Sequence, residues 1–214
     1  PETGGARRQR HVGNPIRAAI AHLDRPALRP AALERYGLHP GRVTVGVVGG
    51  SLGSAPVNGA MLDAAPLLAA AGAQVLHLAG TRFEEGVRAR ADAAPVPWAV
   101  VGFEDEMEWF FAAVDVVVSR ASGMVAELTA TGTPSILVPG SFGSKGHQEA
   151  SAAYLAGAGA AIVVAEDDLD GLGDVVAGLV GDKERRSSMA VAAGRIGRPD
   201  AAEVIAEEVL RAAG

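Results

Sequence analysis

The chain has 214 residues, of which 49% are hydrophobic, enough to bury the core of one large α/β domain and to exclude wholesale disorder. Its net charge of −6 argues against a protein that binds nucleic acid through phosphate contacts, and the absence of cysteine excludes disulfides, zinc–thiolate sites and thiol nucleophiles. No apolar stretch reaches the length of a membrane-spanning helix.

Residues 1–40 differ in composition from the rest of the chain. Arginines are scattered there among prolines, at Arg7, Arg8, Arg10, Arg17, Arg25, Arg29 and Arg35. This composition predicts a linker with two short helices, at Ala18–Leu23 and Ala31–Tyr36. The basic residues could face an anionic membrane or a phosphate, or they could simply be solvated. Because the first residue is Pro1 rather than Met, we expect a fragment, a processed chain or missing upstream residues.

From residue 41 onward, short apolar runs alternate with helical patterns. We expect strands at Val43–Val48, Gln74–Leu78, Ala99–Val101, Asp115–Ser119, Pro134–Pro139 and Ala160–Val164. We expect helices at Val57–Ala71, Thr81–Ala91, Glu106–Ala113, Met124–Thr131, Gln148–Ala156, Leu169–Val180, Lys183–Ala193 and Ala201–Ala212. The alternation predicts an α/β fold, a doubly wound parallel sheet with right-handed crossovers. Ligands of such sheets bind beyond the carboxyl ends of the strands.

The loop Gly49–Gly53 follows the first predicted strand and precedes a helix. Its glycines allow the backbone to approach a ligand closely, and the helix N-terminus together with the Ser51 hydroxyl offers hydrogen-bond donors to an anion. The loop does not match the dinucleotide-binding G-x-G-x-x-G pattern, and the chain contains no Walker P-loop. The loop therefore predicts either a phosphate or diphosphate site, or only a tight strand-to-helix turn.

A second loop, Ser119–Glu127, also joins a strand to a helix. Glu127 falls about one turn into that helix, where a carboxylate can accept hydrogen bonds from two ribose hydroxyls. Its alternative role is a favourable interaction with the positive end of the helix dipole.

A third loop is rich in glycine and runs from Pro139 to the predicted helix at residue 148. Gln148 and Glu149 could hydrogen-bond sugar hydroxyls, and Lys145 and His147 could contact a phosphate. The alternative is a mobile connection without a ligand.

Other residues point to structure rather than chemistry. The acidic run Glu104–Glu106 lacks metal-ligand spacing, and we interpret it as a helix start. The histidines show no ligand spacing, and His77, inside a strand, is predicted to be a core residue. Trp98, Trp109, Phe110 and Phe111 are expected to pack in the core. No G-x-S-x-G elbow supports serine-hydrolase chemistry, and we expect no metal site.

The three loops together resemble, in order and spacing, the C-terminal half of the MurG family, glycosyltransferases that add N-acetylglucosamine to lipid I. The resemblance extends from about Gly13 to Gly214. It is carried by Gly13–Arg17 (G-N-P-I-R), Gly49–Gly53 with Asn58, His77–Gly80, Gly102–Met107, Ser119–Ala121 with Glu127, Gly132 with Pro134 and Pro139, and His147–Gln148. The joint pattern is much more specific than any single loop.

The resemblance implies a Rossmann-like C-terminal domain of a GT-B glycosyltransferase. Residues 41–214 would form the nucleotide-sugar (donor) binding domain, and the N-terminal acceptor domain would be absent from this sequence. The activity implied is inverting, metal-independent transfer of N-acetylglucosamine from UDP-N-acetylglucosamine to a lipid-linked acceptor in peptidoglycan synthesis. The donor is a substrate, and no cofactor is implied. No nucleic-acid partner is expected, and the location implied is cytoplasmic, peripheral at the inner face of the plasma membrane.

The resemblance also implies roles for individual residues. Arg17 and Ser51 would hold the diphosphate, with Gly50 and Gly53 in the same loop. The backbone around Phe103 and Glu104 would read the uracil.

On the other loops, Glu127 would hold the ribose, and Gln148 and Glu149 would touch the sugar hydroxyls. Backbone N–H groups at Ser122, Gly123 and Met124 would stabilise the departing diphosphate. The general base of the family lies in the N-terminal half, so no catalytic residue is assigned here.

The chain differs from the family pattern at Leu52, Gly146, Glu149 and Ala152, where the family has Gln, Asp, Gln and Asn. The segment Arg120–Glu127 is also one residue shorter. These differences fall at sugar and phosphate contacts. They keep open a MurG-like half for another sugar or acceptor, a naturally separate subunit, a non-catalytic nucleotide-binding module, and a UDP-sugar 2-epimerase, which shares the GT-B architecture.

Overall fold

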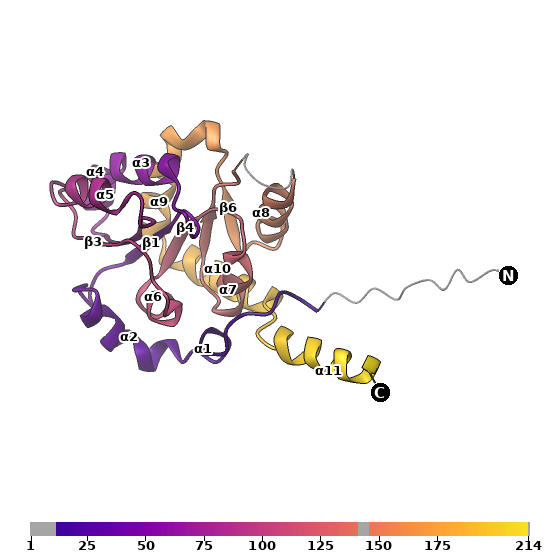
Figure 1. Ribbon diagram of the computed structural model, residues 1–214. Coiled ribbons are helices and arrows are strands. Elements are labelled where there is room, and N and C mark those ends of the chain that lie inside the picture. Colours follow the sequence, from indigo (N-terminus) through magenta and orange to yellow (C-terminus); the bar gives the residue numbers. More distant parts are fainter. Residues whose placement is uncertain (1–11, 141–145, 214) are drawn as a thin grey trace.

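The computed structural model describes residues 12–140 and 146–213, which form helical layers around a central sheet (Figure 1). Arg7, Arg8 and Arg10 of the predicted basic cluster and Lys145 of the third loop lie outside the described residues.

The sheet has six parallel strands in the order β3-β2-β1-β4-β5-β6. The strands are β1 Thr44–Val48, β2 Gln74–Leu78, β3 Trp98–Val101, β4 Val116–Ser119, β5 Ser135–Leu137 and β6 Ala161–Val163. The order reverses between β1 and β4, which is the switch point of a doubly wound fold. The predicted parallel, doubly wound α/β fold is confirmed.

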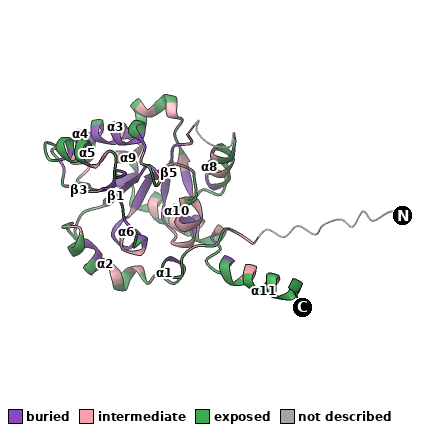
Figure 2. Cartoon of the chain, viewed as in Figure 1, coloured by how far each residue is buried: buried purple, intermediate pink, exposed green. Residues whose placement is uncertain are grey.

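The strands at the switch point are buried on both faces, as their β-branched sequences predict. Every residue of β1, β2 and β4 is buried (Figure 2). Val45 pairs with Val75 on one side and with Val116 on the other. The carboxyl ends of β1, β2 and β4 are therefore held in a fixed register at one edge of the sheet.

Helices cover the two faces of the sheet. One face packs against α1 Ala18–Ala21, α2 Arg25–Arg35, α6 Met107–Ala113, α7 Met124–Ala130, α8 His147–Gly157 and α10 Lys183–Ile196. The other face packs against α3 Ala55–Asp63, α4 Ala65–Ala70, the 3-10 helix η1 Glu166–Gly171 and α9 Leu172–Gly181. A smaller cluster lies under α5 Glu84–Ala91.

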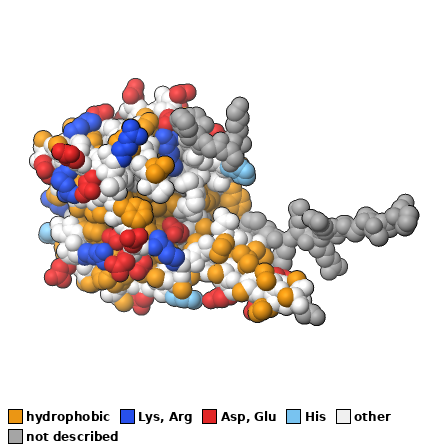
Figure 3. Space-filling view, in the orientation of Figure 1, with side chains coloured by type: hydrophobic (Ala, Val, Ile, Leu, Met, Phe, Trp, Pro, Cys, Tyr) orange, Lys and Arg blue, Asp and Glu red, His pale blue; other side chains and the backbone are white. Residues whose placement is uncertain are grey.

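The last helix, α11 Ala201–Ala213, extends from the body of the molecule (Figure 1). Apolar side chains gather over it in Figure 3, and Val209 and Leu210 are 62% and 73% exposed. No helix in the described part of the chain is long and apolar enough to span a membrane.

The segment before β1, predicted to be a linker, packs on the domain from residue 18 onward. Ile20 and Leu33 are buried in the same cluster as Phe110 and Phe111 of α6. Asp24 caps α2, where its Oδ1 accepts a hydrogen bond from Ala27 N at 3.1 Å. Helix α2 therefore begins at Arg25, earlier than the predicted start at residue 31.

Two arginines of α2 fix it to the end of α6. Arg25 donates to the carbonyl oxygen of Val114, and Arg29 Nη1 donates to that of Ala113 at 3.1 Å. Arg29 Nη2 also donates to Asp115 Oδ2 at 2.9 Å, and the same oxygen accepts from Thr44 N at 2.8 Å. These arginines satisfy carbonyls that a helix C-terminus leaves unpaired, so they are structural rather than solvated.

The helix predicted at residues 57–71 is two helices, α3 and α4, which meet at Ala64. Pro66 lies in the first turn of α4. Proline has no N–H to continue the hydrogen-bond ladder of α3, so its position favours a new helix start.

Candidate functional site

The loop after β1 turns sharply on its glycines. A Cβ on Gly49 would lie 2.3 Å from Ser54 N, and Gly50 has a φ of +91° that favours glycine. Helix α3 begins after Ser54, whose hydroxyl caps it and also accepts a hydrogen bond from Arg120 Nη2 at 2.9 Å. Gly50 and Ser51 are left on the surface of a cavity at the edge of the sheet.

Gly53 does not line the cavity. It allows the loop after β1 to pack closely against the loop after β2. A Cβ at this position would lie 2.3 Å from the Ala79 carbonyl oxygen and 3.1 Å from Gly80 Cα. Asn58 of α3 fixes the same contact, because its Nδ2 donates to Ala79 O at 2.9 Å. The loop after β1 is thereby fastened to the end of β2.

His77 lies behind this contact and is fully buried, which confirms that it is a core residue. Its Nε2 is 3.0 Å from Asn58 Oδ1, and no described residue bonds its Nδ1. Burial lowers the pKa of His77 to about 3. The neutral ring therefore acts as the donor that orients the Asn58 amide.

The cavity at the carboxyl ends of β1 to β4 has a volume of about 320 Å³. It is lined by Arg17, Val48, Gly50, Ser51, Leu78, Gly80, Gly102, Phe103, Glu104, Met107, Ser122, Gly123, Met124 and Glu127. The structure thus brings together all the predicted site residues except Gly53, Gln148 and Glu149. We refer to this space as the strand-end cavity.

The prediction missed the apolar part of this lining. Val48 and Leu78 are the last residues of β1 and β2, and Met107 is the first residue of α6. Because the cavity lies beyond the strand ends, the terminal residue of each predicted strand was the signal that could have identified Val48 and Leu78.

Helix α7 supplies one wall of the cavity. Glu127 lies in its first turn, and no side chain caps the helix at Gly123. Burial raises the pKa of Glu127, and the positive charge of Arg17 opposes that effect. No hydrogen bond from the described residues is made to the Glu127 carboxylate.

The segment Gly102–Met107 supplies the opposite wall. Arg17, which precedes α1, donates to the carbonyl oxygen of Asp105 on this wall. Phe103 is 55% exposed, whereas Glu104 is 9% exposed. The acidic run does precede a helix, since α6 begins at Met107.

The third predicted loop does not line the strand-end cavity with its described residues. Gln148 Oε1 accepts a hydrogen bond from Gly140 N at 2.9 Å, and Glu149 is exposed at the start of α8. Gly140 also packs against Arg120, since a Cβ there would lie 2.9 Å from Arg120 Nη1. Arg120 forms an ion pair with Glu166 and so links this loop to η1.

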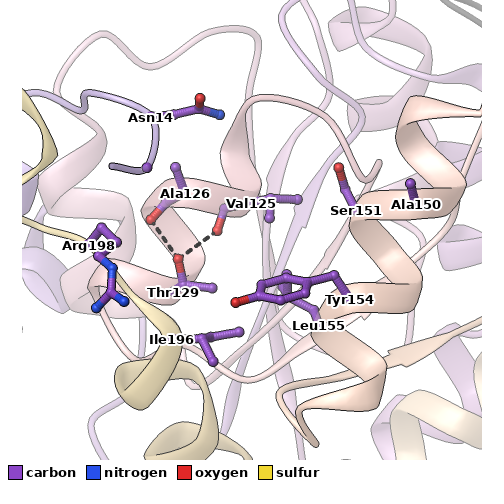
Figure 4. Close-up of a pocket in the computed structure, with 11 residues that line it drawn as sticks. Asn14, Val125, Ala126, Thr129, Ala150, Ser151, Tyr154, Leu155, Ile196 and Arg198 are labelled. Atoms are coloured by element: carbon purple, nitrogen blue, oxygen red, sulfur yellow. Dashed lines mark hydrogen bonds between the residues drawn. The ribbon is translucent and has the colours of Figure 1, made fainter. Parts of the chain in front are cut away.

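A second cavity, also of about 320 Å³, lies among helices (Figure 4). Its walls come from α7, α8, the end of α10 and the segment at Asn14. Thr129 lines it, and its hydroxyl donates to the carbonyl oxygens of Val125 and Ala126 in its own helix (Figure 4). This cavity lies away from the strand ends and contains none of the predicted site residues.

No group of three or more His, Asp or Glu side chains among residues 12–140 and 146–213 is placed to hold a metal ion. The polar groups available to a ligand in the strand-end cavity include the side chains of Arg17, Ser51 and Glu127 and the backbone of the loops. The arrangement offers a carboxylate, a cation and helix-start amides on one side, and main-chain groups beside an aromatic ring on the other.

Comparison with known proteins identifies the family of this chain. The glycosyltransferase family 28 C-terminal domain matches residues 44–205. The UDP-N-acetylglucosamine–N-acetylmuramyl-(pentapeptide) pyrophosphoryl-undecaprenol N-acetylglucosamine transferase of Mycolicibacterium paratuberculosis is 42% identical over 202 residues, which are 93% of this chain and 49% of that protein. The enzyme of the same name from Thermobifida fusca is 37% identical over 207 residues, which are 95% of this chain and 54% of that protein.

Solved structures share the fold. The crystal structure of Acinetobacter baumannii MurG matches with a TM-score of 0.74 and 23% identity, over 90% of this chain and 55% of that chain. UDP-GlcNAc 2-epimerase from Neisseria meningitidis matches with a TM-score of 0.60 and 10% identity, over 86% of this chain and 48% of that chain. The architecture is therefore common to transferases and epimerases.

The chain spans about half the length of the curated relatives it matches. The family match, by contrast, covers all six strands of the sheet and every loop of the strand-end cavity that follows them. On this evidence, the chain belongs to the family of glycosyltransferase family 28 C-terminal domains.

Proposed function

We propose that this chain is the donor-binding half of an inverting, metal-independent glycosyltransferase. It would bind UDP-N-acetylglucosamine, whose sugar is transferred to a lipid-linked acceptor, lipid I in peptidoglycan synthesis. The observation that carries the proposal is the convergence of Arg17, Ser51 and Glu127 on one strand-end cavity. The names of the relatives at 37–42% identity supply the sugar nucleotide and the acceptor.

The two walls of the cavity fit different parts of this donor. Arg17, Ser51 and the amides of Ser122–Met124 would hold the diphosphate, and their donors would stabilise its growing charge as it departs. Glu127 would accept hydrogen bonds from the ribose hydroxyls. The Phe103–Glu104 segment would face the base.

The acceptor and the general base belong to a separate acceptor-binding half in this proposal. Gln148 and Glu149 would reach the sugar at the interface between the halves. The complete enzyme would act at the cytoplasmic face of the plasma membrane as a peripheral protein, where a lipid-linked acceptor is accessible. The donor is a substrate, and we propose no further cofactor.

A different sugar at the same site is the second candidate. The Gln148 amide oxygen already accepts from Gly140 N, and Leu52 is 83% exposed in place of the glutamine that the family carries. UDP-glucose and UDP-N-acetylgalactosamine therefore belong in the same assay as UDP-N-acetylglucosamine.

Thermal unfolding of the 214-residue chain with and without nucleotide sugar tests the proposal. UDP-N-acetylglucosamine at about 100 times its Kd is expected to stabilise the fold by about 2.7 kcal/mol. Glu127→Ala should abolish this protection. Glu207→Ala, which removes an exposed carboxylate from α11, is the matched control and should retain it. An unchanged melting curve of the wild-type chain at millimolar nucleotide would overturn the proposal.

A further inference from the structure

Glu104 lines the strand-end cavity, yet its carboxylate is hydrogen-bonded by residues that do not line the cavity. Tyr36 Oη donates to Glu104 Oε2 at 2.7 Å, and Arg35 Nη2 donates to both carboxylate oxygens at 3.2 and 3.3 Å. Glu106 N donates to Oε1 at 3.0 Å. Three donor groups therefore make four hydrogen bonds to a side chain that is only 7% exposed.

The two side-chain donors are Arg35, the last residue of helix α2, and Tyr36, which follows it, and both precede the family match. Arg35 also donates to Glu106 Oε2 at 2.9 Å, and its guanidinium lies 5.0 Å from the centre of the Trp109 ring. Burial and the hydrogen bond to Glu104 raise the pKa of Tyr36, so its hydroxyl keeps its proton and remains a donor. Two adjacent residues at the end of α2 thus hold Glu104 and Glu106, and with them the loop between β3 and α6.

This arrangement determines what the wall can offer a ligand. The Glu104 carboxylate is already paired, so the wall presents main-chain N–H and C=O groups beside the exposed Phe103 ring. Such a surface suits a planar base, which carries donors and acceptors on its edge and an apolar face. The opposite wall has an unpaired carboxylate and helix-start amides, which suit ribose hydroxyls and phosphates.

We propose that Arg35 and Tyr36 are positioning residues that set the backbone of residues 102–106 for base selection. The inference rests on the proposed function, in which the cavity binds a uridine nucleotide. Uracil presents an N3–H donor next to the O4 acceptor, whereas cytosine presents an N3 acceptor next to an N4 amino donor. Main-chain N–H and C=O groups can discriminate between these two patterns only when the direction of those groups is fixed. The contacts of Arg35 and Tyr36 with Glu104 and Glu106 supply that restraint.

Tyr36→Phe tests the proposal, because it removes one hydroxyl and keeps the ring. The measurement is the affinity of the 214-residue chain for UDP and for CDP by titration calorimetry. We expect the UDP affinity to fall by a factor of about 5–30 with little change in the CDP affinity, so that the ratio of the two affinities decreases. Arg29→Gln is the matched control on the same helix, since Arg29 bonds α6 and Asp115 instead of Glu104. It should lower stability without changing the affinity ratio.

A purely structural role for Tyr36 would lower both affinities equally or neither, and that result would overturn the inference while the proposed function stands. If the wild-type chain binds neither nucleotide, the proposed function itself fails and the inference fails with it. Glu104→Gln provides a second variant should Tyr36→Phe not fold, because it keeps the shape but removes the charge that holds Arg35. Hydrogen exchange of the Glu106 amide should then become faster, and unchanged exchange with an unchanged ratio would also refute the proposal.

Discussion

Two glutamates line the strand-end cavity in opposite surroundings. Glu104 accepts hydrogen bonds from Arg35, Tyr36 and its own loop, and it is among the buried polar residues. The Glu127 carboxylate receives none from the described residues, although burial raises its pKa. A half-buried carboxylate without partners is costly to ionise, whereas a paired one stabilises the fold. We infer that the Glu104 carboxylate fixes the backbone of its wall, whereas the Glu127 carboxylate is available to bind a ligand.

Replacing each carboxylate in the free chain tests this contrast most directly. Glu104→Ala should lower the free energy of unfolding by about 2–3 kcal/mol, because it leaves the Tyr36 hydroxyl and the Glu106 amide unpaired. Glu127→Ala should leave the free energy of unfolding unchanged or slightly higher. Urea denaturation of both variants without nucleotide measures the difference. An equal decrease in the free energy of unfolding for both variants would mean that the two carboxylates do not differ in their structural role.

The buried His77, which is hydrogen-bonded to Asn58, adds an acid-sensitive contribution to the stability of the fold. Because the pKa of His77 falls to about 3 in the folded chain from an ordinary value of 6.5, the unfolded chain binds more protons between these pH values. Stability is therefore complete above pH 6.5 and is lost as pH falls toward 3, by at most about 1.4 kcal/mol per pH unit.

His77→Gln removes this titration while retaining a donor toward Asn58. Unfolding free energies of wild type and variant should therefore differ in their slope between pH 3 and 6.5, and should run parallel above it. Curves that run parallel over the whole range would show that His77 does not titrate on unfolding.

The smallest expected effect concerns the ionisation of Glu127. Its pKa lies above the ordinary 4.5, so the free chain should lose a little stability as pH rises through that range. Affinity for UDP-N-acetylglucosamine should change in the opposite sense and rise, since the ionised carboxylate is the better acceptor for ribose hydroxyls. Calorimetric titrations from pH 4.5 to 7.5 measure this, and Glu127→Gln should flatten the profile. A flat wild-type profile would exclude a carboxylate–ribose contact.

The sequence predicted the strands well because each is a short, mostly apolar run between helical patterns. Val43–Val48 was expected and Thr44–Val48 is found, and Gln74–Leu78 is identical in both. Errors occurred at prolines. Pro26 and Pro30 were left outside the predicted helices but lie in α2 after the Asp24 cap, whereas Pro66 was placed inside one predicted helix but lies in the first turn of α4.

The candidate site was predictable where it follows strand ends and not where it depends on distant pairing. Ser51 and Phe103 lie in loops that follow predicted strands, Glu127 lies in the first turn of the helix after such a loop, and all three line the cavity. The bond between Tyr36 and Glu104 joins residues 68 positions apart, which no local pattern reveals. Glu104 was therefore expected to act only through its backbone, with no account of what holds that backbone in place.

The position of α2 also bears on how such domains can be recombined. The family match starts at residue 44, whereas Arg29, Arg35 and Tyr36 precede it. A graft that transfers only the matched segment between relatives would remove the side-chain donors that Arg29 gives to Asp115 and that Arg35 and Tyr36 give to Glu104, and would uncover the apolar side of α6. Chimeras that exchange nucleotide preference should therefore carry the helix ahead of the sheet as part of the exchanged unit.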